Sequence, residues 1–504
     1  MTGEVDLESA RSAIDAAYAH IESGRPDHAL ALTAPLAQAP MPTHAALVAH
    51  SQALKALGRP EESLACDRRA AQLYPQSAVA WHNLGATAGD LERTAESKQA
   101  LERAFSMGLD RPETLQAYAR TLYLMGETAA AERAFRMVLQ RRPDDAATAR
   151  ELAELLWMAT GDIRLATTPL AEAMMQGADE EAIAATLIQM YEIAGRRDDL
   201  RTLFERLLAR KPDHAGFLAS AARARLVDGE VDAALDLIDR SLAIDPMLTS
   251  SLVQSAAVRL AAGRVEEALD AARTARDIEP DNQAVWGWLA ACARAAGEPE
   301  YESLFDYDAF VRPYKLDTPE GWDTLDSFLA DLASSLRGLH RTRAEPVAQS
   351  VRGGTQTFGN LALLEHPVLR AFFQALERPI MTYIRDLGAS AHPFLARNTG
   401  RYRIQSAWSV RLREQGHHSN HYHPEGWISS AFYVALPPTP AGSREGWLQL
   451  GEPPYSTATP QPPARFVKPE PGMLVLFPSY MWHGTAPFSA NAERLTIAFD
   501  AVPA

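Results

Sequence analysis

The chain has only two cysteines among its 504 residues, and it has neither a long apolar segment nor an excess of basic residues. Cys66 and Cys292 are too few and too distant for a disulfide framework, so we interpret both as small buried residues. No apolar run reaches the roughly 18 residues that span a bilayer. The net charge of −15 disfavours broad contact with nucleic-acid phosphates, although a local basic groove stays open. We therefore expect no membrane insertion and no nucleic-acid partner.

The N-terminal segment MTGEVDLESA has no basic stretch followed by an apolar run, the pattern of a secretory signal. We read this as the absence of a secretory signal and expect a cytoplasmic location. A hydrophobic content of 47% and a charged content of 22% are ordinary for globular proteins. At this length we expect two or more domains, each with its own core.

The first 300 residues carry a ladder of glycines spaced mostly 34 residues apart, with one skipped position at Glu92. A small residue follows most of these glycines five positions later, and prolines recur at similar intervals. Glycine permits a tight turn, alanine allows two helices to approach closely, and proline ends a helix, so the pattern predicts stacked helix pairs. The ladder consists of Gly24, Gly58, Gly126, Gly161, Gly195, Gly229, Gly263 and Gly297.

This repeat resembles the tetratricopeptide family, and the segments Trp81-x-x-Leu84-Gly85 and Trp286-x-x-Leu289-Ala290 match the pattern of its first helix. The resemblance implies an all-α solenoid with a concave groove that binds an extended peptide or a helix of a partner protein. We expect the solenoid to cover residues 1–300 and residues 301–318 to form its cap and a linker.

The remaining residues, 319–504, have a different pattern. Helical spacing predicts helices over 319–340 and 367–387. From about residue 401, short runs rich in β-formers alternate with proline- and glycine-rich stretches. Together these features predict a double-stranded β-helix, or double-sheet jelly roll, buttressed by helices.

Five of the fourteen histidines fall between residues 417 and 483. His421 and His423 stand at i and i+2, so on an extended strand they point to the same side. Imidazole nitrogens are common ligands for iron, zinc and copper, and His483 from a distant strand would complete one face of an ion. The pattern predicts a metal site with open positions.

The segments HYHPEGWISSAFYVALP, PGMLVLFPSYMWHGTAPF and ERLTIAFD resemble the iron(II)/2-oxoglutarate-dependent dioxygenases, and more narrowly a bacterial family with an H-x-H-P segment. The resemblance covers residues 400–502, with a weaker match at 349–357. It implies that His421 and His483 are the first and last metal ligands, and that no catalytic residue is separate from the metal centre.

His423 departs from the family pattern, because most members have aspartate or glutamate there. Three neutral imidazoles still suit iron(II), zinc or copper, so metal binding is a firmer expectation than metal identity. Two alternatives stay open. Glu425 could supply the carboxylate, or two histidines and waters could hold the iron, as in aspartyl β-hydroxylase-like enzymes.

The resemblance also implies that Arg494 binds the distal carboxylate of 2-oxoglutarate, which the planar guanidinium fork suits. Thr496 lies on the same face of the expected strand, and Tyr433 is a third candidate contact. Each of these residues also has a simpler structural interpretation. Arg494 could pair with a surface acid, and Thr496 and Tyr433 could be core residues. The implied cofactors are Fe(II) and 2-oxoglutarate, with ascorbate as a further expected reductant.

The resulting hypothesis is a dioxygenase that uses dioxygen to hydroxylate a protein or peptide side chain presented by the repeats. A small-molecule hydroxylase with regulatory repeats and a non-catalytic metal-binding adaptor are the alternatives. The sequence does not identify the substrate, the hydroxylated atom or the oligomeric state.

Overall fold

A computed structural model of the protein describes residues 7–504. Residues 1–6 of the segment MTGEVDLESA, from which we predicted the absence of a secretory signal, lie outside the described residues. Within residues 7–504, no helix combines the length and the apolar character that crossing a membrane requires.

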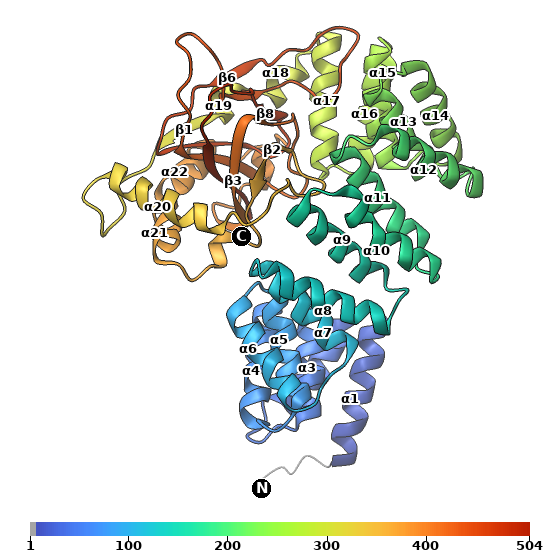
Figure 1. Cartoon of the computed structure of the whole chain (residues 1–504), viewed down its shortest axis with the longest axis vertical. Helices are drawn as coiled ribbons and strands as arrows, with labels where there is room; N and C mark the ends of the chain where they lie inside the picture. The colour runs from blue at the N-terminus through green and yellow to red at the C-terminus, as the bar shows by residue number, and fades with distance from the viewer. Residues whose placement is uncertain (1–6) are drawn as a thin grey trace. The chain divides into compact units, whose positions relative to one another are not determined.

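The chain divides into two compact units (Figure 1). One comprises the residues up to Leu155 together with Thr168–Glu180, and the other comprises Leu156–Thr167 and Glu181–Ala504. The second unit therefore contains both repeat helices and all the strands of the described chain. The predicted boundaries at residues 300 and 318 stay a prediction.

Paired helices fill the first 300 residues, as the glycine ladder predicts, and the predicted class of an all-α solenoid followed by a strand-rich region is confirmed. Their bounds are α1 Leu7–Glu22, α2 Pro26–Ala37, α3 His44–Ala56, α4 Pro60–Leu73, α5 Ala78–Asp90, α6 Thr94–Ser106, α7 Pro112–Leu124, α8 Thr128–Arg141, α9 Ala146–Thr160, α10 Ile163–Met175, α11 Glu180–Ile193, α12 Arg197–Arg210, α13 Ala215–Val227, α14 Val231–Ile244, α15 Thr249–Ala261, α16 Val265–Ile278 and α17 Gln283–Ala296. Two short helices follow, α18 Glu300–Leu304 and α19 Tyr307–Phe310.

Every glycine of the ladder adopts a positive φ, between 63° and 79°, at the turn between two helices of a pair. Glu92, at the skipped position, adopts the same left-handed conformation with φ 55°. The turn geometry is therefore imposed by the packing of the helix pair and not by glycine alone, and Glu92 tolerates a conformation that costs an L-residue about 1–2 kcal/mol.

Glu92→Gly is therefore expected to raise the free energy of unfolding by about 0.5 kcal/mol, the relief of that strain less the greater unfolded-state entropy of glycine. Gly126→Ala is the matched change in the opposite direction, at an equivalent turn with φ 69°. It should lower the free energy of unfolding by about 1 kcal/mol. Chemical unfolding followed by circular dichroism measures both. A loss of stability in Glu92→Gly would contradict the expectation.

Two antiparallel sheets form the C-terminal region, one in the order β1-β7-β4-β9-β3-β2 and the other in the order β6-β5-β8. The assignment of this pair of sheets to a jelly roll stays a prediction. The strands are β1 Arg312–Lys315, β2 Val351–Gln356, β3 Tyr402–His418, β4 Ile428–Ala435, β5 Leu448–Leu450, β6 Arg465–Val467, β7 Met473–Pro478, β8 His483–Thr485 and β9 Arg494–Pro503. The remaining elements are α20 Leu325–Leu339, α21 Pro367–Ala375, α22 Glu377–Leu387 and the 3₁₀ turns η1 Leu361–Leu363 and η2 Leu395–Arg397.

Three predicted segments differ in the structure. The helix expected over 319–340 begins only at Leu325, because the Thr324 and Ser327 side chains form a capping box there. The helix expected over 367–387 is two helices that meet at Leu376. Part of the expected linker 301–318 is β1, which pairs with β7 at the edge of the larger sheet.

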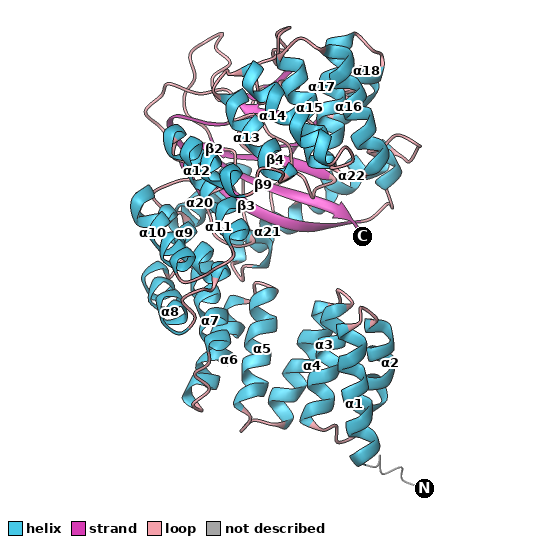
Figure 2. Cartoon of the chain, turned by 90° about the vertical axis from the view of Figure 1, so that its right-hand side faces the viewer, coloured by secondary structure: helices cyan, strands magenta, loops and turns pink. Residues whose placement is uncertain are grey.

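One hydrophobic core joins repeat helices to the sheets inside the second unit (Figure 2). The Trp482 indole donates a hydrogen bond to the Gly287 carbonyl of α17 at 2.8 Å, and its ring packs edge-on against Trp288. A Cβ at Gly287 would lie 3.0 Å from the Tyr480 carbonyl oxygen, so glycine permits this close approach. Helix α17 therefore packs directly on the turn that precedes β8.

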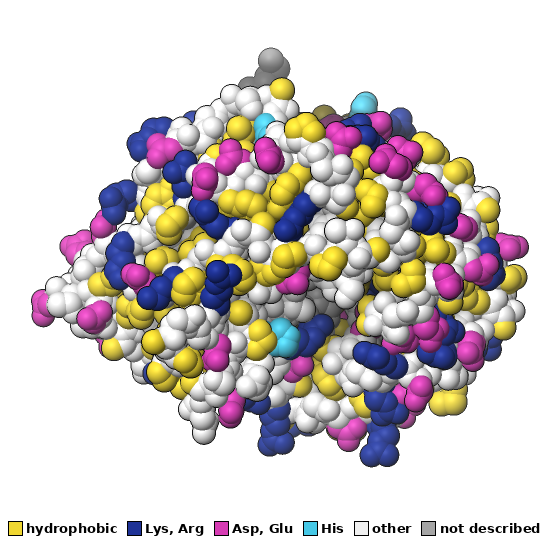
Figure 3. Space-filling view, turned by 90° about the horizontal axis from the view of Figure 1, so that it is seen from above, with side chains coloured by type: hydrophobic (Ala, Val, Ile, Leu, Met, Phe, Trp, Pro, Cys, Tyr) yellow, Lys and Arg dark blue, Asp and Glu magenta, His cyan; other side chains and the backbone are white. Residues whose placement is uncertain are grey.

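The face drawn in Figure 3 carries Lys and Arg side chains interspersed with Asp, Glu and apolar side chains. Charges of opposite sign lie beside one another over most of this face. Such a surface presents no continuous basic stripe on the side shown.

Candidate metal centre

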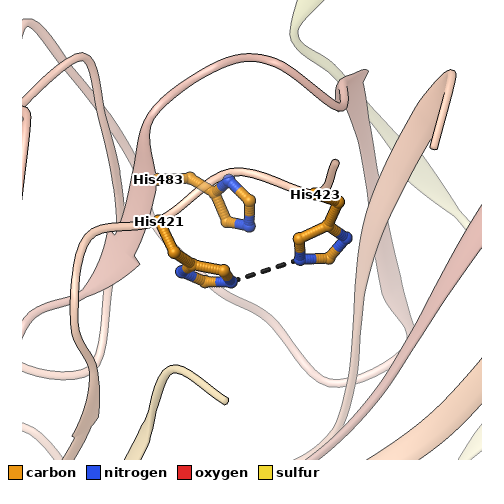
Figure 4. A group of neighbouring side chains, drawn as sticks. All are labelled: His421, His423 and His483. Carbon is orange, nitrogen blue, oxygen red and sulfur yellow. Dashed lines mark hydrogen bonds between the residues drawn. The ribbon is translucent and has the colours of Figure 1, made fainter. Parts of the chain in front are cut away.

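Two chain segments sixty residues apart meet where the predicted ligands lie. His421 follows β3 and forms a two-way backbone bridge with His483, the first residue of β8, with both N–O distances at 2.9 Å. The backbone N–H of His423 donates to the Ser479 carbonyl at 2.9 Å. These bonds hold the two segments side by side and direct three imidazoles toward one point (Figure 4).

The three imidazoles are close enough to share one ion. One ligand nitrogen from each residue lies within 4.8 Å of the others, and the Nε2 atoms of His421 and His423 are 3.2 Å apart. Two nitrogens that bind one ion at right angles, each about 2.1 Å from it, are separated by about 3 Å. The spacing of His421, His423 and His483 therefore suits a single transition-metal ion.

The hydrogen bonds of the rings determine which nitrogen is available. The Nδ1 atom of His421 lies 2.8 Å from the Ser419 carbonyl oxygen, and that of His483 lies 2.9 Å from the Met481 carbonyl oxygen. A carbonyl oxygen only accepts, so each Nδ1 carries the proton and each Nε2 presents a lone pair. This is the tautomer that a metal ligand needs, held in place before any ion binds.

His423 is supported differently. Its Nδ1 lies 2.5 Å from the Asp500 carboxylate on β9 and 3.0 Å from the Ser429 hydroxyl on β4. The same hydroxyl contacts Asp500 at 2.7 Å. A carboxylate behind a ligating imidazole orients the ring and raises its basicity. Asp500 thus supplies a negative charge directly behind His423, the position where an aspartate or glutamate ligand would have carried one.

Burial keeps His421 and His483 neutral. Removal from water, reinforced by the adjacent imidazoles, lowers the pKa of His421 to about 3 and holds the pKa of His483 well below its usual value. At neutral pH these ligands are unprotonated, and a cation would not have to displace a proton from them.

Glu425, the alternative carboxylate ligand, is exposed and accepts a hydrogen bond from the Gln405 amide at 3.0 Å. The group of side chains close enough to share one ion consists of the three imidazoles and does not include Glu425. Asp500 therefore contacts the cluster, and Glu425 does not.

Asp500→Asn is expected to weaken iron(II) binding by about 10- to 100-fold, because the amide leaves His423 less basic and less firmly oriented. Glu425→Gln removes a nearby carboxylate by the same chemical change and should leave the affinity unaltered. Titration of the metal-free proteins with iron(II) under anaerobic conditions compares the two. Equal loss in both variants would show that general negative charge, and not the contact with His423, sets the affinity.

Arg494 begins β9, and its side chain is 2% exposed. Its Nε donates to the Gly446 carbonyl at 3.2 Å, and the guanidinium lies over the Tyr433 ring, 5.1 Å from its centroid. Within the described residues no carboxylate forms a salt bridge with Arg494, whereas the adjacent Glu493 pairs with Arg411 at 2.6 Å. A buried cation without an anion is costly, so this arrangement favours an anionic ligand.

The cluster and this guanidinium share one cavity between the two sheets. Thr496 lines it beside Arg494, in accord with their positions two residues apart on one strand. Tyr433 is fully buried, packs against the guanidinium, and is not among the lining residues. Polar lining residues from other elements are Gln349, Ser350, Gln356, Ser430 and Thr485.

Sequence reasoning missed Asp500 and Ser350. Asp500 had a usable signal, because residues 494, 496, 498 and 500 share one face of β9. Ser350 had none: its hydroxyl contacts His418 at 2.9 Å and His421 at 3.1 Å across about seventy residues of chain. His418, another of the five clustered histidines, ends β3 and lines the cavity.

The residues fit the groups that the motifs imply. Three lone pairs directed at one point suit a divalent transition metal, and a buried guanidinium without a carboxylate partner suits the free end of a dicarboxylate. Both features lie in one cavity.

Comparisons with known proteins agree with this site. A family model described as "Putative 2OG-Fe(II) oxygenase" matches residues 406–500, and a tetratricopeptide-repeat model matches residues 78–107. No curated protein sequence matches the chain.

Similar solved structures are repeat proteins. A tetratricopeptide repeat protein from Parabacteroides merdae is 15% identical with a TM-score of 0.37, over 49% of this chain and 98% of that chain. PilF from Pseudomonas aeruginosa is 18% identical with a TM-score of 0.35, over 42% and 95%. At these TM-scores the likenesses carry no argument, and the assignment rests on the family models and the helices themselves. Residues 406–500 are therefore similar to the 2OG-Fe(II) oxygenase family, and residues 78–107 are similar to the tetratricopeptide repeat.

Proposed function

We propose that the protein is an iron(II)- and 2-oxoglutarate-dependent dioxygenase that hydroxylates a protein or peptide side chain. The observation that carries the proposal is the shared cavity, in which three imidazoles converge and a buried guanidinium has no carboxylate salt-bridge partner among residues 7–504. His421, His423 and His483 would hold the iron, and Arg494 and Thr496 would hold the distal carboxylate of 2-oxoglutarate.

When bound, iron and 2-oxoglutarate, together with dioxygen, supply the oxidising power for C–H hydroxylation. The chain's own residues orient and shield. Carbonyl acceptors fix the tautomers of His421 and His483, and Asp500 fixes the ring of His423. Phe477 packs edge-on against His483 and lines the cavity, which helps to exclude water. Ascorbate would serve as a reductant that keeps the iron ferrous. Tyr433, which packs against the guanidinium, would support Arg494.

The repeats support a macromolecular substrate, because tetratricopeptide repeats commonly bind other proteins. A small-molecule substrate is the second candidate. It is favoured by one observation, namely that loop 451–464 of the oxygenase region already contacts repeat helices α15 and α17.

The test is conversion of 2-oxoglutarate to succinate by anaerobically purified protein reconstituted with iron(II) and then exposed to air. Iron-dependent turnover supports the proposal. Bound metal without turnover in any condition would support the adaptor alternative. Metal analysis of the purified protein decides between iron, zinc and copper.

The substrate class is tested on proteins that co-purify with the chain. A mass increase equal to one oxygen atom after incubation with iron and 2-oxoglutarate supports a protein substrate. Vigorous turnover with no such increase, followed by stimulation from a small-molecule fraction, would favour the metabolite reading.

A further inference from the structure

The loop between β5 and β6, residues 451–464, is much longer than its connection requires. The two strands are antiparallel neighbours, with Leu450 opposite Arg465, and a turn of about two to five residues closes such a pair. Long loops inside compact regions commonly have a function of their own.

The loop lies against the first helices of successive repeats, and its single tyrosine is an aromatic anchor. Tyr455 stacks on Trp288 of α17, with ring centroids 5.8 Å apart and 15° between the planes. The Arg223 guanidinium of α13 interacts with the Tyr455 hydroxyl and with Glu192 of α11, the latter at 2.8 Å. One tyrosine thus contacts α17 and, through its hydroxyl, the ion pair between α13 and α11.

Residues on both sides of the tyrosine form hydrogen bonds with α15 and α17. The Ala458 backbone N–H donates to the Leu260 carbonyl of α15 at 3.1 Å, and the Gln461 side-chain amide donates to the Ala291 carbonyl of α17 at 2.9 Å. Arg294 of α17 donates to the Gly451 carbonyl at 2.9 Å. An anchor side chain flanked by backbone bonds is how an extended peptide is commonly recognised.

The composition of the loop suits this mode of binding. Residues 451–464 read GEPPYSTATPQPPA, with prolines on both sides of the tyrosine. Prolines lack an N–H and prefer an extended backbone, so little conformational entropy is lost when such a segment is bound. The loop is thus a short proline-rich peptide covalently tethered at both ends.

We propose that the face formed by α11, α13, α15 and α17 is a binding site for extended, proline-rich segments with a central tyrosine, and that residues 452–463 occupy it in cis. An external partner that binds this face must displace the chain's own loop. The inference goes beyond the proposed oxygenase activity and does not depend on it, because it concerns binding alone.

The start of the loop also bears on the metal centre, which governs the design of the test. Glu452 accepts a hydrogen bond from Asn420 at 2.8 Å, and Asn420 in turn accepts one from Gln449 at 2.9 Å. Asn420 immediately precedes His421. A shortened loop should therefore retain Gly451 and Glu452 at one end and Ala464 at the other, with residues 453–463 replaced by a Gly-Asn-Gly turn.

The experiment measures binding of a fluorescent synthetic peptide with the sequence of residues 451–464, by fluorescence anisotropy. We expect the shortened chain to bind it with a Kd in the micromolar range. The unaltered chain should bind at least about tenfold more weakly, because the tethered segment competes at an effective concentration near millimolar. Failure of the shortened, folded chain to bind, or equal binding by both chains, overturns the proposal.

Two controls define the contact. In the shortened chain, Arg223→Ala should weaken peptide binding by about tenfold, since the tyrosine hydroxyl loses its partner. A second variant avoids deletion altogether: Tyr455→Ala in the full-length chain weakens the tether and should increase its affinity for the free peptide. Unchanged affinity in that variant likewise overturns the proposal.

Discussion

His483→Ala is expected to lower iron(II) affinity by at least about 100-fold and to abolish 2-oxoglutarate turnover. The change removes a ligand whose tautomer and direction are set in advance by the Met481 carbonyl. Loss of residues that merely support a ligand already costs about 10- to 100-fold, so loss of the ligand should cost no less. Anaerobic iron titration and succinate production are the measurements.

The matched control is His417→Ala. His417 lies on β3, two residues before Ser419, and its Nδ1 lies 3.3 Å from the Gln415 carbonyl oxygen. Because His483 is buried, His483→Gln is added to separate loss of a ligand from loss of packing. Normal iron affinity in both His483 variants, with their folds intact, would refute the metal site. Equal losses in His417→Ala would show that the effect is not specific to the cluster.

Arg494→Met is expected to raise the KM for 2-oxoglutarate by about 30-fold or more. Truncating one partner of a buried, hydrogen-bonded charge pair costs about 2–5 kcal/mol, and the methionine removes the guanidinium while keeping much of its volume. Iron affinity should change little, because Arg494 is not among the three clustered ligands. Steady-state turnover against 2-oxoglutarate concentration gives the KM.

A second readout distinguishes ligand binding from a structural role. Arg494 is a buried cation with no carboxylate partner among the described residues, so its replacement should raise the stability of the ligand-free protein. Arg411→Met is the control, since Arg411 on the neighbouring strand pairs with Glu493 and should leave the KM unchanged. A destabilised Arg494→Met with an unaltered KM would assign this arginine to the fold.

Local rules explain why much of the candidate site could be predicted. His421 and His423 have one residue between them, and residues of that spacing share a side on an extended chain. The same rule places Arg494 and Thr496 on one face of β9, and it extends to Asp500, which carries the charge expected at position 423. The prediction omitted Asp500 because the search for a carboxylate stayed close to the histidines in sequence.

The long-range contacts could not be predicted in this way. Ser350 reaches His421, Gly446 accepts from Arg494, and β1 pairs with β7, each across a wide gap in sequence. No periodicity encodes which segments become neighbours. Those partners follow from sheet order, which depends on how the whole region packs.

The repeat spacing shows the same division. A 34-residue interval and the conformational freedom of glycine suffice to place the helix turns, including the one at Glu92, because a turn depends on residues close in the chain. The contacts of the first helices of the later repeats could not be predicted in this way: the sequence predicted a groove that binds a partner, and the structure places residues 451–464 against α15 and α17. Patterns along the chain therefore determined the elements and the ligand types, whereas tertiary packing decided which distant backbone and side-chain groups meet, since those contacts depend on the arrangement of the whole unit.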